Sequence, residues 1–142
     1  MKKQMLRFAF IVLVIVVLMF STSAAATPTT TFTLISGLPA VMHVGDRATV
    51  IVQVNSDPAY SFVSAMALQS AFYPGRGVVA RGRDGIDRSG TGSSATLSIT
   101  FTAIGSTAKF AGGVAPVSVV AEANYANSGI VSQAFNFNVQ VP

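Results

Sequence analysis

The side chains most able to bind a ligand or take part in a reaction are concentrated in residues 80–94. This stretch holds three arginines, two aspartates and four glycines. Its charged members are Arg81, Arg83, Asp84, Asp87 and Arg88. Asp84 and Asp87 could offer carboxylates to calcium, but the alternating acidic spacing and the final Glu of an EF-hand loop are missing. The glycines and the mixed charges instead predict a solvated loop between strands, with contact to a protein partner as its functional alternative.

Other catalytic chemistry lacks the residues that it needs. The sequence has one imidazole, His43, and no Gly-x-Ser-x-Gly turn that would present a serine nucleophile. A structural zinc site is excluded, because the chain has no cysteine and a single histidine. Of the remaining carboxylates, Asp46 and Asp57 are expected in turns and Glu122 on a solvated strand face. The sequence therefore predicts a protein that is not an enzyme and that uses no metal and no cofactor.

Residues 1–26 have the layout of a secretory signal peptide. Basic residues at the start precede an unbroken apolar run over residues 8–20, and small residues follow it. The run is shorter than the roughly 20 residues of a membrane-spanning helix, and Ala24 and Ala26 suit signal peptidase, so we expect cleavage after Ala26. The alternative is an uncleaved anchor over residues 8–26, which would be the protein's only membrane contact. Either way the sequence predicts a secreted or cell-surface location.

Removal of residues 1–26 changes the electrostatic picture. Three of the nine basic residues lie in this segment and none of the five acidic ones, so six basic and five acidic residues remain. A nearly neutral chain lacks the basic face that nucleic-acid binding requires. Residues 27–142 are enough for one domain, and without cysteine it must be held together by apolar burial alone.

Alternation of apolar and polar residues dominates the segment 27–142. The clearest case is residues 94–103, where Leu97, Ile99 and Phe101 share one face, which is expected in the core. Thr96, Thr100 and Thr102 share the other, which is expected in solvent. The segments that we predict as strands are 31–35, 48–55, 62–72, 78–81, 94–103, 117–125 and 132–141. Residues 127–129, Asn-Ser-Gly, predict a hairpin turn before the last strand, and Pro74-Gly75 predicts another turn. This pattern predicts an all-β fold, an antiparallel immunoglobulin-like (Ig-like) β-sandwich of about seven strands, with a closed barrel as the alternative.

Residues 44–55, Val-Gly-Asp-Arg-Ala-Thr-Val-Ile-Val-Gln-Val-Asn, resemble the second strand of bacterial Ig-like surface domains, in which a Val-Gly-Asp turn opens an alternating strand. Residues 117–125 and the following hairpin are similar to the last two strands of that group. The chain departs from antibody-type domains, because it has no Trp and no Cys pair, and Tyr125 lies at the end of its strand. Gly45-Asp46, followed later by Phe72-Tyr73-Pro74, is also similar to the opening of cohesin modules, which bind dockerins.

The Ig-like resemblance implies a fold and no particular activity. We therefore expect an exported, non-enzymatic module for extracellular or cell-surface structure or adhesion. Its expected partner is an extracellular protein or surface component, or a second copy of itself. One alternative is a fibre subunit in which residues 27–35 add a strand to a neighbouring copy, and another is a cohesin-like protein-binding module.

Overall fold

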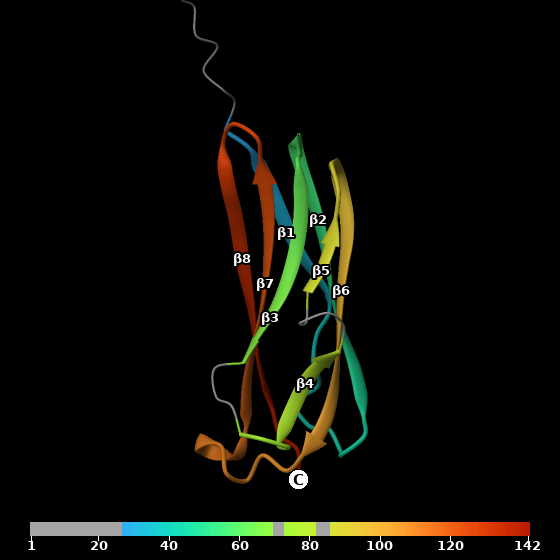
Figure 1. The fold of residues 1–142 in the computed structure, drawn as a ribbon, viewed down its shortest axis with the longest axis vertical. Helices are drawn as coiled ribbons and strands as arrows, with labels where there is room; N and C mark the ends of the chain where they lie inside the picture. The colour runs from blue at the N-terminus through green and yellow to red at the C-terminus, as the bar shows by residue number, and fades with distance from the viewer. Residues whose placement is uncertain (1–26, 70–72, 82–85) are drawn as a thin grey trace, which may run out of the picture.

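A computed structural model describes residues 27–69, 73–81 and 86–142, and within these ranges the chain forms eight strands and one short 3-10 turn (Figure 1). The strands are β1 (Thr29–Ser36), β2 (Arg47–Tyr60), β3 (Phe62–Gln69), β4 (Gly77–Arg81), β5 (Ile86–Ser89), β6 (Gly92–Gly105), β7 (Ala115–Tyr125) and β8 (Gly129–Val139). The turn η1 (Ala111–Gly113) lies between β6 and β7. The predicted signal peptide lies outside the described residues.

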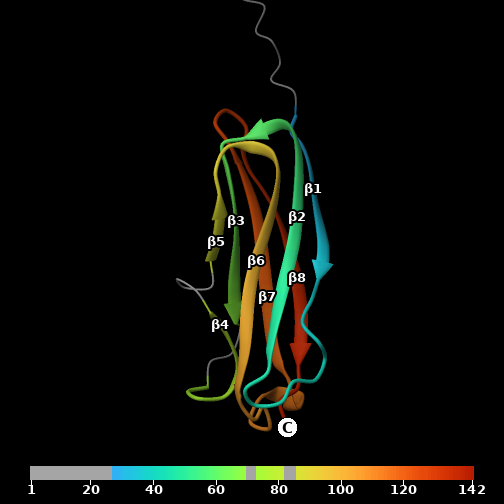
Figure 2. The same ribbon diagram turned by 90° about the vertical axis from the view of Figure 1, so that its right-hand side faces the viewer.

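The strands form two four-stranded sheets that pack face to face (Figure 2). The first sheet has the order β1-β2-β6-β4 and the second β5-β3-β7-β8, with antiparallel pairing between every pair of neighbours. This is the order A-B-E-D and C-F-G of Ig constant-type domains, with β5 added at the outer edge of the second sheet. The protein is an antiparallel Ig-like β-sandwich, and the closed-barrel alternative is wrong.

The core lies between the sheets and is filled by the alternating residues of the long strands. Every second residue of β7, from Ala115 to Tyr125, is buried. In β6 the predicted inward residues Leu97, Ile99 and Phe101 are at most 2% exposed. Their neighbours in β2 are Val50, Val52 and Val54, which are buried as well. Period-two alternation therefore predicted correctly the core face of β6, except that Thr102, which we placed on the polar face, is buried as well, at 8% exposed.

All seven predicted strands are present, and one strand was missed. Gly75 and Gly129 both have positive φ, at +68° and +82°, and lie in the two predicted turns. The region 62–69, whose Ala, Met and Leu content also suits a helix, is strand β3 because both of its edges are paired, with β5 and β7. The missed strand is β5, which lies in the stretch that we predicted to be a loop.

Asp57 does not lie in a turn, which corrects the sequence prediction. It belongs to β2 and is paired with Thr29 of β1. Beyond this point β2 bends over the end of the sandwich, and its last residue, Tyr60, is paired with Gly92 at the start of β6 (Figure 2). Ser56 and Asp57 are paired with β1, and pairing with β6 resumes at Tyr60, so the bend lies within β2 at Pro58 and Ala59.

Candidate functional site

The charged stretch 80–94 connects the outer edges of the two sheets. Arg81 is the last residue of β4 in the first sheet, whereas Asp87 and Arg88 lie in β5 of the second sheet. Arg83 and Asp84 lie outside the described residues. The prediction of a loop is therefore wrong for residues 86–89, which form β5, and for Gly92 and Ser93, which begin β6.

The pairing partner explains why β5 is a strand. Its four residues pair with β3, with Val63 opposite Ser89 and Met66 opposite Ile86. The sequence Ile-Asp-Arg-Ser has one apolar residue and weak strand propensity, so local pattern gives no signal for it. The strand forms because the edge of β3 is available, which is a tertiary effect.

We expect that the charged stretch contributes little to stability and holds no calcium. Replacement of Arg83, Asp84, Asp87 and Arg88 together by Ser should change the melting temperature only slightly, because exposed ion pairs contribute about 0 to 1 kcal/mol. Calorimetry with and without Ca²⁺ should show no calcium-dependent shift in either protein, since only a bound ligand stabilises by mass action. A rise in the parent that EDTA reverses and the variant lacks would identify a calcium site.

His43 and Asp46 form a small turn before β2. The Asp46 carboxylate accepts a hydrogen bond from the backbone N–H of His43 at 2.8 Å and lies 3.6 Å from the His43 Nδ1. The backbone N–H of Asp46 in turn donates to the His43 carbonyl at 2.9 Å. Gly45, with φ of +95°, completes the turn. Asp46 is therefore a turn residue, as predicted, and its carboxylate orders the backbone.

A buried polar cluster closes the end of the sandwich where β2 bends. Tyr125, the last residue of β7, is 7% exposed, and its hydroxyl is hydrogen-bonded to the hydroxyls of Ser56 in β2 and Thr30 in β1. Ser56 also donates to the Pro58 carbonyl at 2.8 Å. Nearby Tyr60 is 1% exposed, and its burial, with a smaller contribution from Tyr125, raises the pKa of its phenol above the usual value of 10.0. The cluster ties β7 to the opposite sheet.

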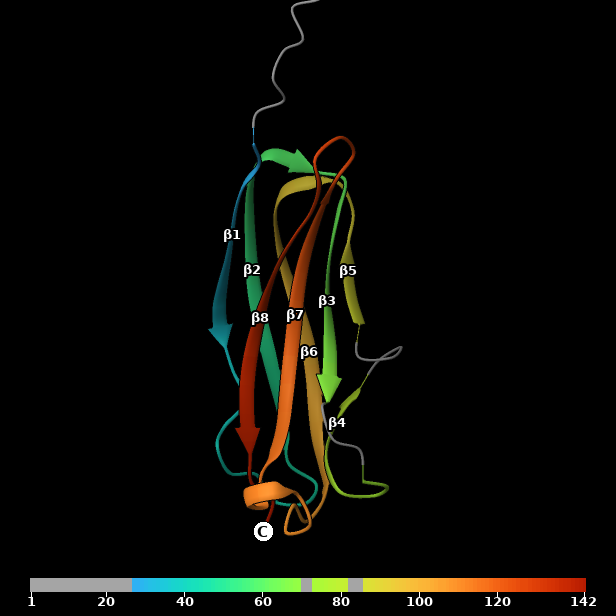
Figure 3. The same ribbon diagram turned by 90° about the vertical axis from the view of Figure 1, so that its left-hand side faces the viewer.

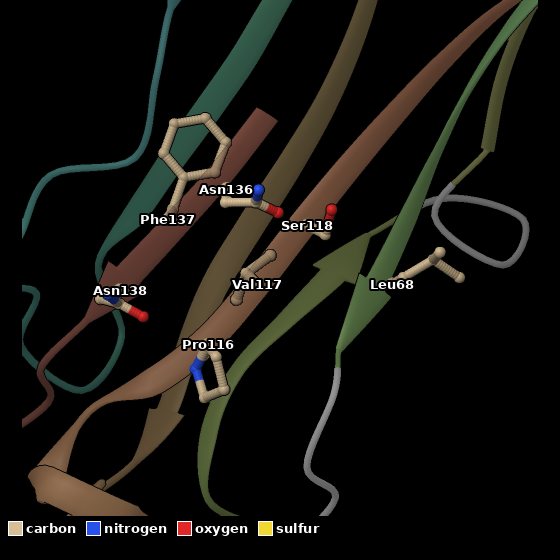
Figure 4. Close-up of a pocket in the computed structure, with 7 residues that line it drawn as sticks. All are labelled: Leu68, Pro116, Val117, Ser118, Asn136, Phe137 and Asn138. Atoms are coloured by element: carbon tan, nitrogen blue, oxygen red, sulfur yellow. The ribbon is translucent and has the colours of Figure 1, made fainter. Parts of the chain in front are cut away.

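An open groove of about 480 Å³ runs over the outer face of the second sheet (Figure 4). It is lined by residues of β3, β7 and β8, namely Leu68, Pro116, Val117, Ser118, Asn136, Phe137 and Asn138. Leu68 of β3 is 47% exposed, and Asn136 and Asn138 of β8 lie on the other side of β7 from it. The groove can accept an apolar group of a ligand, and its amides can form hydrogen bonds with polar groups beside that apolar group. None of its lining residues is charged. Sequence reasoning missed it because three strands contribute to it.

The outer face of the first sheet is polar and, over β2 and β6, held by side-chain hydrogen bonds. Gln53 donates to Ser94 at 2.8 Å and accepts from Thr96 at 2.7 Å, and Thr49 is bonded to Thr100 at 2.9 Å. Ser94 also donates to the Asn55 side chain. These bonds fix hydroxyls and amides in a flat, uncharged array.

No group of three or more metal-binding side chains lies together in the described residues. The same part of the chain has no helix long and apolar enough to cross a membrane.

Comparisons with known proteins give structural neighbours but no family. No family model matches the chain, and no curated protein matches it. Among solved structures, a chimeric titin Z1Z2 functionalised with a KLER exogenous peptide from decorin is 20% identical, with a TM-score of 0.38, over 81% of this chain and 95% of the other. A conjugative transposon lipoprotein from Bacteroides eggerthii is 18% identical, with a TM-score of 0.41, over 76% and 95%. The Ig-like architecture of this chain follows from its strand order.

Proposed function

We propose that this protein is an exported, non-enzymatic Ig-like module that serves in extracellular or cell-surface structure or adhesion. The observation that carries the proposal is the array of hydrogen-bonded hydroxyls and amides on the outer face of β2 and β6, opposite the face of these strands that packs into the core. Such a surface suits contact with another macromolecule, because ordered hydroxyls and amides can hydrogen-bond a partner without the cost of desolvating charges. The signal-peptide pattern of residues 1–26 supports export.

The non-enzymatic part of the proposal rests on how the polar groups are used. The carboxylate of Asp46 is engaged with backbone in a turn, and the hydroxyl of Tyr125 lies in a buried cluster between the sheets. The groove on the second sheet is lined by amides, apolar groups and the hydroxyl of Ser118, and its lining residues include no base. These groups build and position surfaces, and none of the arrangements pairs a nucleophile with a base.

The two alternatives gain less support. In the fibre hypothesis residues 27–35 add a strand to a neighbouring copy, but here β1 is paired with β2 of its own chain from Thr29 to Ser36, with one bulge at Ile35. In the cohesin hypothesis the Gly45-Asp46 turn is present, whereas Phe72, part of the second motif, lies outside the described residues. The adhesion or structural role is therefore the one that we propose.

Export is tested by expressing residues 1–142 in a bacterial host and determining in which compartment the protein is found. We expect the protein outside the cytoplasm, with Thr27 as its first residue, and digestible by protease added to intact cells if it stays at the surface. Replacement of Ala24 and Ala26 together by Leu should block processing, because signal peptidase requires small residues at these positions.

A matched control replaces Ala25, between them, by Leu and should be processed normally. Recovery of a membrane-bound form that still begins with Met1 would contradict cleavage. Recovery of the protein in the cytoplasm would contradict export and with it the proposed function.

A further inference from the structure

The open edges on the two sides of the sandwich differ sharply. Along one side lie β4 and β5, which are five and four residues long and contain Arg81, Asp87 and Arg88. Along the other side lie β1 and β8, which are eight and eleven residues long and contain no charged residue and no proline. Figure 3 shows β1 and β8 together on one side and β4 and β5 on the other.

Natural sheets protect open edges with short strands, charges or prolines, because an unprotected edge pairs with other chains. The β4 and β5 side has short strands and charges, so its edges are protected in this way. The β1 and β8 side has neither device, and β8 is the longest edge strand of the described fold. A long edge strand without these protections is a template for pairing with another chain.

The backbone of β8 presents unpaired groups at this edge. Both backbone groups of Gln140, just beyond β8, point away from β7, since its N–H donates to Ala40 and its carbonyl accepts from Met42. In an antiparallel strand the direction of the backbone groups alternates from one residue to the next. The backbone N–H and C=O groups of the even-numbered residues from Ile130 to Asn138 therefore point toward the open edge. Among the described residues, the segment that contains Ala40 pairs with this edge only at Gln140, and no other described segment pairs with the outer edge of β8.

We propose that β8 pairs antiparallel with β8 of a second copy of this chain, around a two-fold axis at Ala134, to form one continuous eight-stranded sheet. This inference rests on the proposed function and names its partner. In this register the residues that come opposite each other in the two β8 strands are compatible. Val131 comes opposite Phe137 and Gln133 opposite Phe135 on the inner face, and Ser132 comes opposite Asn136 on the outer face. No like charges meet, and β-branched and aromatic side chains pair across the new strand boundary.

Charge exchange at Ala134 tests the pairing, because this exposed residue would lie opposite its own copy. Exported protein should be a dimer by sedimentation velocity. Ala134→Lys and Ala134→Glu should each weaken the dimer by about tenfold or more, since like charges directly opposite each other destabilise a strand pair. A mixture of the two variants should form the heterodimer again. The matched control Ala108→Lys, at an exposed alanine outside β8, should remain dimeric.

Cross-linking gives a second readout, because the chain has no natural cysteine. Ala134→Cys should form a disulfide-linked dimer on mild oxidation, whereas Ala108→Cys should not at the same concentration. Circular dichroism should show that all variants are folded. A monomer in every preparation, an open-ended polymer, or a dimer that Ala134→Lys leaves intact would overturn the inference. None of these outcomes tests export, so a failure of this inference and a failure of the proposed function would be distinguishable.

Discussion

Replacing Phe101 with Asp should unfold the domain. Phe101 lies in the middle of the core face of β6, is 2% exposed, and is paired across the sheet with Ala48 and Ala80. Truncation of a buried Phe costs about 3–5 kcal/mol, and a buried carboxylate without a partner adds to that loss. Domains of this kind are stable by only about 5–15 kcal/mol. Calorimetry should therefore show no cooperative transition, or one at a much lower temperature.

The matched control introduces the same charge into the same strand on the opposite face. Thr96 is exposed and donates a hydrogen bond to Gln53, so Thr96→Asp should cost about 0.5–1.5 kcal/mol, the value of that bond. Thr100 is a poorer choice, because it is half-buried and bonded to Thr49. Similar losses of stability in Phe101→Asp and Thr96→Asp would contradict the assignment of the two faces of β6.

Local alternation is sufficient to predict most of this fold. In β7, and in β6 as far as Phe101, the side chains alternate between core and surface, and a window of a few residues reveals this. The turns at Gly75 and Gly129 were also predictable, because glycine takes positive φ with little strain. Each of these features depends on residues adjacent in the chain.

The features that sequence did not reveal depend on distant residues. The strand β5 requires the edge of β3, and the groove combines Leu68 with residues of β7 and β8. Of the candidate site residues, Arg81 lies in β4 of one sheet and Asp87 and Arg88 lie in β5 of the other. The hydroxyl of Tyr125 meets its partners 69 and 95 positions away in the sequence. Pattern within one strand carries no information on such contacts.

Tyr125 allows the second strong prediction, which concerns the link between the sheets. Tyr125→Phe keeps the buried ring and removes only the hydroxyl that is shared with Ser56 and Thr30. Loss of one partner of a buried hydrogen bond costs about 1–3 kcal/mol, so the variant should unfold at a clearly lower urea concentration. Tyr73→Phe is the matched control and should change little, because Tyr73 is 39% exposed and packs edge-on against Phe110.

A double-mutant cycle with Ser56→Ala isolates the contact itself. If the Tyr125 and Ser56 hydroxyls stabilise the fold through each other, the double variant should lose less than the sum of the two single losses, with a coupling of about 0.5–3 kcal/mol. Ser56 retains a second role, because it donates to the Pro58 carbonyl, so Ser56→Ala alone should cost more than the coupling. Additive losses would mean that Tyr125 acts only through its ring and that the hydroxyl cluster does not join the sheets.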